Sequence, residues 1–169
     1  WNKLDDCKMS KEIKIALKFL LITAQRKSEV IEAEWNEFNF KDKWWTIPKT
    51  KTKNKKSHRV PLPPIGIEVL NEMKKITGEY KFVFASPIGV TKRNPNRRVG
   101  MSPILGASVD HALRDNLIDD LDTGRINIFK LDHFTPHDLR RTATSIMSKS
   151  GVPRLTLKKI LNHSDGEVT

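Results

Sequence analysis

The stretch Thr135-Pro136-His137-Asp138-Leu139-Arg140-Arg141-Thr142 has the composition of a helix start. Thr135 is a typical N-cap, and Pro136 suits the first helical position because its missing N–H would have no partner there in any case. On such a helix His137 and Arg140 stand three residues apart, so both side chains project from nearly the same face. Taken alone, this pair would usually be a surface pair or a buried histidine with a neighbour.

Outward from this stretch, the chain reads as mainly helical. Apolar residues recur at three- and four-residue steps behind Ser10, a plausible N-cap, and Gly78 is typical of a helix end. Ser28 could cap a shorter helix, and Ser102-Pro103 could start another. We expect helices over residues 11–24, 28–35, 64–77, 102–116, 136–150 and 154–161. Residues 82–85 form a short buried segment, and residues 117–132 give no clear pattern.

Between residues 37 and 62 the period of the apolar residues changes to two, which is typical of strands. The alternating pairs are Phe38 and Phe40, Trp45 and Ile47, and Val60 and Leu62. We expect a small antiparallel sheet of three strands, with the basic run 49–56 as the turn between the second and third.

Length and composition limit the class of protein. The chain has 169 residues, of which 37% are hydrophobic and 30% charged, which favours one folded domain over residues 1–169. A single cysteine, Cys7, excludes an internal disulfide framework and a cysteine-based zinc cluster. Lys14 and Lys18 interrupt the longest apolar stretch, around residues 17–24, which is too short to span a bilayer.

A metal site built on histidine is not predicted either. Pro136 separates His133 from His137, and no acidic residue completes a known ligand pattern. We therefore expect no metal and no cofactor.

The net charge of +11 favours a polyanionic partner, of which nucleic acid is the commonest. Residues 41–59 contain eight Lys or Arg and one acid, Asp42. This basic stretch and a second, acid-free basic cluster together favour contacts to a phosphate backbone over solvated loops. The residues expected to contact DNA are Lys49, Lys51, Lys55, Lys56 and Arg59 in the first cluster and Lys92, Arg93, Arg97 and Arg98 in the second.

Four motifs occur in a set order. They are Ala24-Gln25-Arg26-Lys27-Ser28-Glu29-Val30, Ser57-His58-Arg59-Val60-Pro61-Leu62, the stretch 135–142, and Ile160-Leu161-Asn162-His163-Ser164. This order closely resembles the catalytic domain of tyrosine recombinases, in the branch of phage and genomic-island integrases. The resemblance covers residues 13–169. It implies a mainly α fold with a small three-stranded antiparallel sheet, the fold of DNA breaking-rejoining enzymes.

The resemblance also implies a role for each matching residue. Arg26 and Arg140 match the two catalytic arginines, and His137 and His163 match two further active-site positions. Lys53 best matches the lysine that acts as general acid, with Lys51 as a rival. Glu29 would orient an arginine. Ala24 stands where the family often has glycine.

The nucleophile of this family is a tyrosine roughly ten residues beyond the position of His163, where it would attack phosphorus. Tyr80, the one tyrosine, fits no such position. We therefore expect residues 1–169 to be a fragment, inactive alone, which lacks the tyrosine segment and the N-terminal DNA-binding domains of the whole protein.

The resemblance implies site-specific recombination that integrates a prophage or genomic island, by cleavage and rejoining of DNA through a 3′-phosphotyrosyl intermediate. It further implies a bacterial cytoplasmic protein that associates with the nucleoid and assembles as a homotetramer on double-stranded attachment sites. The residues leave two alternatives open. One is a basic DNA-binding domain without activity, and the other is an enzyme like the type IB topoisomerases, which cut without strand exchange.

Overall fold

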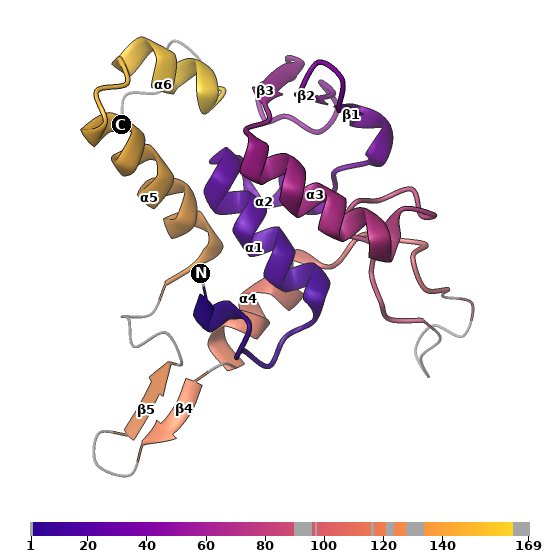
Figure 1. The fold of residues 1–169 in the computed structure, drawn as a ribbon. Helices are drawn as coiled ribbons and strands as arrows, with labels where there is room; N and C mark the ends of the chain where they lie inside the picture. The colour runs from indigo at the N-terminus through magenta and orange to yellow at the C-terminus, as the bar shows by residue number, and fades with distance from the viewer. Residues whose placement is uncertain are drawn as a thin grey trace.

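The structure is a computed structural model that describes residues 2–89, 96, 98–115, 117–120, 124–127 and 134–163. Its helices are α1 (Lys11–Thr23), α2 (Lys27–Ile31), α3 (Pro64–Thr77), α4 (Gly106–Asp115), α5 (Pro136–Lys149) and α6 (Arg154–Ile160), with short 3-10 helices η1 (Asn2–Leu4) and η2 (Trp35–Glu37). The strands are β1 (Phe38–Asn39), β2 (Trp44–Ile47), β3 (His58–Pro61), β4 (Leu117–Asp120) and β5 (Gly124–Asn127) (Figure 1). Within these described parts, no helix has the length and apolar character needed to cross a membrane.

Helix α1 forms the centre of the main core. The Ser10 hydroxyl accepts a hydrogen bond from the backbone N–H of Ile13, as expected of an N-cap. From the middle of the helix the buried ring of Phe19 packs against Trp45, at 5.6 Å between ring centroids, and against Phe84, at 6.1 Å. The apolar stripe predicted for this helix therefore joins the small sheet to the segment that follows α3.

The predicted three-stranded sheet is confirmed. Its order is β1-β2-β3, and both pairs are antiparallel, with Trp45 opposite Val60 and Ile47 opposite His58. Trp45, Ile47 and Val60 are buried, while Thr46 and Arg59 are exposed. The alternation seen in the sequence thus corresponds to one buried and one outward face.

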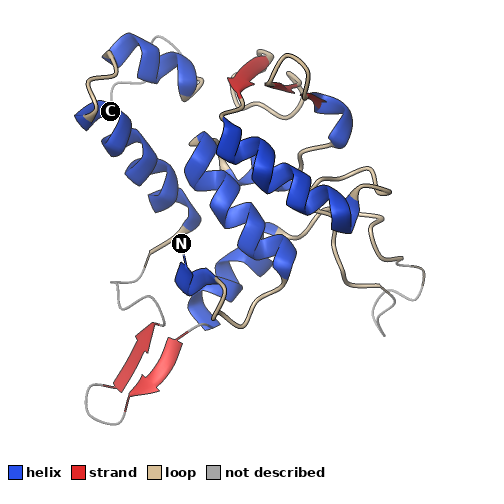
Figure 2. Ribbon diagram, in the orientation of Figure 1, coloured by secondary structure: helices blue, strands red, loops and turns tan. Residues whose placement is uncertain are grey.

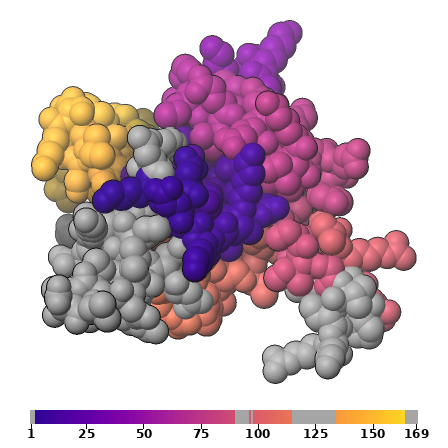
Figure 3. Space-filling view, turned by 60° about the horizontal axis from the view of Figure 1, so that its bottom comes forward, coloured from indigo at the N-terminus to yellow at the C-terminus, as the bar shows by residue number. Residues whose placement is uncertain are grey.

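The C-terminal helices have an apolar cluster of their own. Ala143 of α5 and Leu161, just after α6, pack with Ala24 at the end of α1, and Leu21 and Met147 add to them. The remaining core belongs to a separate and much larger cluster. Figure 3 shows the C-terminal helices in yellow as a lobe at one side of the molecule.

Ala24 adopts a left-handed conformation, with φ of 55° and ψ of 24°. Glycine reaches this region without a steric penalty, and a left-handed residue is a common way for a helix to end. The glycine that the family often has here is thereby explained. Alanine takes its place with its methyl group buried in the C-terminal cluster.

Two of the predicted helices have wrong boundaries. The second helix begins after Arg26 rather than Ser28, because the Glu29 carboxylate accepts from the Arg26 backbone N–H and caps the helix start. It ends at Ile31, before a separate 3-10 turn at Trp35. Helix α4 begins at Gly106, because Pro103 bridges to Ala85 in extended conformation and so cannot start a helix.

Residues 117–127 contain an element that the sequence did not predict. Strands β4 and β5 pair antiparallel as a two-stranded sheet, with Leu117 opposite Asn127, apart from the three-stranded sheet (Figure 2). The β4–β5 pair follows α4 and precedes α5, so it lies outside the segments that carry the predicted site.

The position of Phe19 gives a test of the main core. Phe19→Ala should lower the free energy of unfolding by about 3–5 kcal/mol, because a ring surrounded by other rings leaves a cavity that the core fills poorly. Ile65→Ala, at a residue 47% exposed, should change it by less than about 0.5 kcal/mol. Denaturant unfolding of both variants measures these values, and equal losses would contradict the assignment of Phe19 to the centre of the core.

Candidate phosphate-binding site

Arg140 of α5 is buried, with 5% of its surface exposed. Its Nη1 donates to the Ala24 carbonyl at 2.7 Å, and its Nη2 donates to the Leu161 carbonyl at 2.6 Å. Nη2 also lies 3.3 Å from Nε2 of His163. Since a guanidinium only donates, His163 accepts through Nε2 and, when neutral, carries its proton on Nδ1. One side chain thus joins the ends of α1 and α6 to α5.

Arg26 stands at the start of α2, held by Glu29. The Arg26 Nη1 lies 3.0 Å from Oε1 of Glu29, and the Arg26 backbone N–H donates to Oε2 at 3.0 Å. The Glu29 side chain is 1% exposed, while 23% of the Arg26 side chain is exposed. A buried carboxylate therefore fixes the direction of a guanidinium that still reaches solvent.

A cavity of about 350 Å³ brings Arg26, His137 and Arg140 together. His137 is exposed on the first turn of α5, where the Thr135 hydroxyl and backbone N–H both donate to the Asp138 carboxylate. These two bonds lower the pKa of Asp138 and hold the helix start in place. The other residues that line the cavity are Gln25, Lys27, Ser28, Asp110, Thr135 and Pro136.

The residues that line this cavity carry a net positive charge. Its one lining carboxylate, Asp110, pairs with Lys27 at 2.6 Å between Nζ and Oδ2. Arg26 and Arg140 therefore face the cavity with no second lining acid among the described residues, and their planar forks of donors suit a phosphate. In the described parts of the chain, no group of three or more His, Cys, Asp or Glu could hold a metal ion.

The carbonyl of Ile160, at the end of α6, accepts hydrogen bonds from two side chains that are distant in the sequence. Gln25 donates to it through Nε2 at 2.9 Å, and Nε2 of His58 lies 3.1 Å away. Because a carbonyl only accepts, His58 must carry its proton on Nε2. Gln25 and His58 belong to the quoted motifs, but no sequence pattern indicates contacts that span 135 and 102 residues.

The turn between β2 and β3 meets the same segment. Asn54 Nδ2 donates to Oδ1 of Asn162 at 2.8 Å, which ties the turn to the residue before His163. Lys53, next to Asn54, is exposed on this turn. The structure thus joins the turn that carries Lys53 to the segment that carries His163, through a pair of asparagines that the sequence analysis did not single out.

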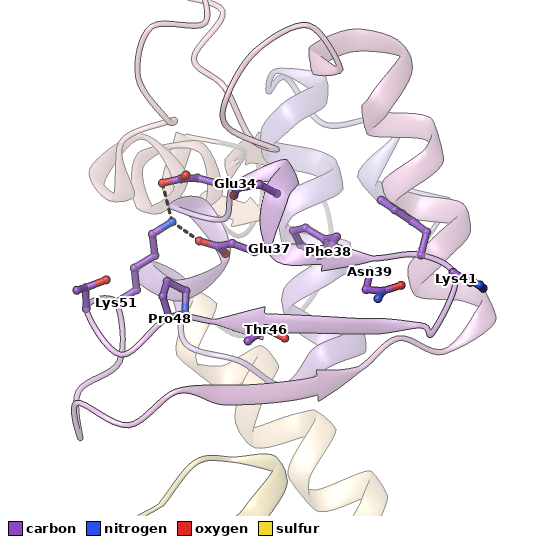
Figure 4. Close-up of a pocket in the computed structure, with 11 residues that line it drawn as sticks. Glu34, Glu37, Phe38, Asn39, Lys41, Thr46, Pro48 and Lys51 are labelled. Carbon is purple, nitrogen blue, oxygen red and sulfur yellow. Dashed lines mark hydrogen bonds and ion pairs between the residues drawn. The ribbon is translucent and has the colours of Figure 1, made fainter.

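The ammonium of Lys51 is held by oxygens of the segment around Glu34. Its ammonium donates to the Glu32 carbonyl at 2.7 Å and to Glu34 at 3.0 Å, and it also contacts Glu37 (Figure 4). Burial opposes ionisation of Glu34, but hydrogen bonds from Lys51 and Lys81 lower its pKa below the usual value. All three ammonium hydrogens are engaged, so Lys51 is a poorer candidate than Lys53 for the general acid and for a DNA contact.

The other predicted DNA contacts have mixed outcomes. Lys49, Lys55, Lys56 and Arg59 are exposed on the turn and on β3, and Arg98 is exposed as well. Lys92, Arg93 and Arg97 lie outside the described residues, as does Asn116, the expected end of the fourth helix.

Sequence comparisons relate this chain to known proteins. The sequence model of the phage integrase family matches residues 2–169. Prophage integrase IntA of Escherichia coli K12 is 27% identical over 145 residues, which cover 86% of this chain and 30% of that protein. The integrase of Enterobacteria phage P4 is 33% identical over 91 residues, 47% of this chain and 21% of the relative. The chain therefore spans less than a third of these relatives.

Solved structures share the fold. The Tn1549 transposon integrase in complex with circular intermediate DNA matches with a TM-score of 0.63 and 15% identity, over 98% of this chain and 55% of that one. A lambda integrase tetramer bound to a Holliday junction matches with a TM-score of 0.63 and 17% identity, over 99% of this chain and 46% of that one. The expected fold, mainly α with a small antiparallel sheet, is confirmed.

The buried imidazole of His58 predicts that the free energy of unfolding depends on pH. Burial disfavours the charged ring and lowers the pKa of His58 below 6.5, its ordinary value. The bond to Ile160 and the charge of Glu29 oppose this shift, while Arg140 and Arg26 add to it.

Because the unfolded chain binds the proton more readily, the free energy of unfolding should fall as the pH drops below about 6.5 and level off below the folded pKa. His58→Gln keeps an N–H donor but does not titrate. Its free energy of unfolding should therefore depend less on pH between about 7 and about 5, as denaturant unfolding would measure. An unchanged pH profile would show that His58 does not bond to Ile160 as a neutral ring.

Proposed function

The chain belongs to the phage integrase family, and from this premise we propose that residues 1–169 form the catalytic domain of a site-specific recombinase that cuts and rejoins duplex DNA. The observation that carries the proposal is the shared cavity of Arg26, His137 and Arg140, with His163 beside Arg140. Its natural occupant is the scissile phosphate.

In the proposed reaction a tyrosine oxygen bonds to phosphorus, and the bond from phosphorus to the 5′ oxygen breaks. The product is a 3′-phosphotyrosyl link, which a 5′ hydroxyl from a second DNA end later reverses. Negative charge grows on the non-bridging oxygens during the attack, and the two arginines would neutralise it with donors that keep their protons. His137 would position the phosphate or exchange the proton of the nucleophile, and His163 would donate a hydrogen bond to a phosphate oxygen.

We assign the general acid to Lys53. The leaving 5′ oxygen needs a proton, and a lysine ammonium placed at that oxygen can donate one. Lys53 is exposed on a turn that Asn54 ties to Asn162, next to His163. The engagement of Lys51 by Glu34 and Glu37 supports this choice of register.

The nucleophile is proposed to be a tyrosine roughly ten residues beyond His163, outside residues 1–169, so these residues alone would bind DNA without cutting it. Tyr80 does not line the cavity. It packs over Gly100, where an added Cβ would lie 2.2 Å from the Tyr80 ring. This close packing supports a structural role for Tyr80.

The whole protein is proposed to act on attachment sites in bacterial DNA, in the cytoplasm and on the nucleoid, and to integrate a prophage or genomic island. We also propose a homotetramer that holds two duplexes. The fold likeness to a lambda integrase tetramer bound to a Holliday junction supports this assembly.

DNA binding can be tested on residues 1–169 alone. Lysines that contact phosphates release counterions, so replacing Lys49, Lys55 and Lys56 by Ala should reduce the slope of log affinity against log salt by about 2–3. A variant with the same charge change at the exposed Lys8, Lys11 and Lys75 should retain the parent slope. Equal slopes for both variants in a fluorescence titration would contradict binding through the turn.

The acid can be tested in the longer protein that carries the tyrosine. Lys53→Ala should slow cleavage of ordinary DNA by about 100-fold or more, the scale of a positioned acid. A substrate with sulfur in place of the 5′ bridging oxygen needs no proton on its leaving group. Lys53→Ala should therefore cleave this substrate nearly as fast as the parent does. Arg26→Ala and Arg140→Ala should stay slow because they act on the non-bridging oxygens. Rescue of Lys51→Ala in place of Lys53→Ala would show that the assignment is wrong.

A further inference from the structure

A second cavity lies between the turn after β2 and helix α6, with a volume of about 510 Å³. We call it the hairpin–α6 groove, after the hairpin that β2 and β3 form. From the sheet side it is lined by Trp44, Asn54, Lys56, His58, Arg59 and Pro61, and from the α6 side by Thr156, Lys158, Lys159, Ile160, Asn162 and His163. This volume lies within the usual range of small-ligand sites.

The groove is basic on both walls. Lys56 and Arg59 come from the sheet side, and Lys158 and Lys159 from the last turn of α6. No carboxylate belongs to its lining, and none of these four cations pairs with a carboxylate within the described residues. Four positive charges that face one cavity repel each other, and an anion between them would remove this cost.

Trp44 holds one of these cations in place. The guanidinium carbon of Arg59 lies 4.4 Å from the centroid of the Trp44 ring, close enough for a cation–π interaction. Both residues belong to paired strands, with Arg59 opposite Thr46 on β2. A guanidinium that is stacked on a ring of the sheet loses less conformational freedom when it binds an anion than a free one does.

The groove adjoins the cavity of the proposed scissile phosphate. His163 lines the groove and lies 3.3 Å from Arg140, which lines that cavity. The two walls of the groove are already joined, by the bonds from Asn54 to Asn162 and from His58 to Ile160. These bonds hold the two walls of the groove together.

We propose that the hairpin–α6 groove is a second phosphate subsite, which binds a phosphate of the same DNA strand next to the scissile one. This inference rests on the proposed function, because it takes the occupant of the Arg140 cavity to be DNA. It adds Lys158, Lys159 and the Trp44–Arg59 pair to the residues that hold the strand.

The first test compares two matched pairs of lysines in residues 1–169. Lys158→Ala/Lys159→Ala should reduce the salt slope of duplex DNA binding by about 1–2, since each phosphate contact accounts for about 0.9. Lys74→Ala/Lys75→Ala removes the same charge from the last turn of α3 and should leave the slope unchanged. Equal slopes for the two variants would overturn the subsite, whereas a parent that binds no DNA would overturn the proposed function itself.

The second test locates the phosphate. The affinities of the parent and of Lys158→Ala/Lys159→Ala are measured for duplexes in which a single phosphate is replaced by a neutral methylphosphonate. At one position next to the scissile phosphate, the neutral linkage should weaken DNA binding by the parent about tenfold, as the loss of a charged contact does. DNA binding by the variant should weaken much less. Equal weakening of both proteins at every position would overturn the assignment.

Trp44 provides a further check on the same DNA. Trp44→Phe keeps a ring under Arg59 and should bind DNA more tightly than Trp44→Leu, which should bind as weakly as Arg59→Ala. Melting temperatures measured alongside separate a loss of contact from a loss of fold. Equal affinities of the Phe and Leu variants would exclude a role for the ring.

Discussion

The two carbonyl bonds of Arg140 are the constraint on which the site depends. Backbone carbonyls at the end of a helix have no partner within the helix, and here the Arg140 guanidinium supplies one for Ala24, after α1, and one for Leu161, after α6. Both bonds are charge-assisted and are shielded from water. A lysine offers a single point charge and could not satisfy two carbonyls in the plane of one rigid group. The fold and the proposed chemistry thus draw on the same guanidinium.

The end of α6 extends this arrangement. Its carbonyls and the asparagine that follows receive side chains from the loop after α1, from β3 and from the turn before β3. Each contact joins segments that are far apart in the sequence. The basic groove and the arginine cavity lie on either side of this junction, so the residues that would hold neighbouring phosphates are positioned by one set of backbone acceptors.

Local signals made much of the fold predictable, and long-range contacts made part of the site unpredictable. Ser10 and Thr135 cap helices as expected, because capping depends on residues a few positions apart. The predicted start of α4 is wrong because Pro103, which suits a helix start, instead forms an isolated β-bridge with Ala85. The strands β4 and β5 were missed because residues 117–127 lack regular apolar alternation. The grouping of Arg26, His137 and Arg140 followed from motif order, whereas the donors to Ile160 could be found only in three dimensions.

The separate apolar cluster around Ala143 and Leu161 has a consequence for cooperativity. The buried apolar groups at the ends of α5 and α6 form a small cluster with α1, and hydrogen bonds from Arg140 and Gln25 add to the attachment of these helices. Segments attached in this way open at a lower free energy than the whole domain. The amide protons of α5 and α6 should then exchange with solvent sooner than those of α1. A ligand that bridges Arg26 and Arg140 would close this opening, so substrate binding and the last step of folding become thermodynamically linked.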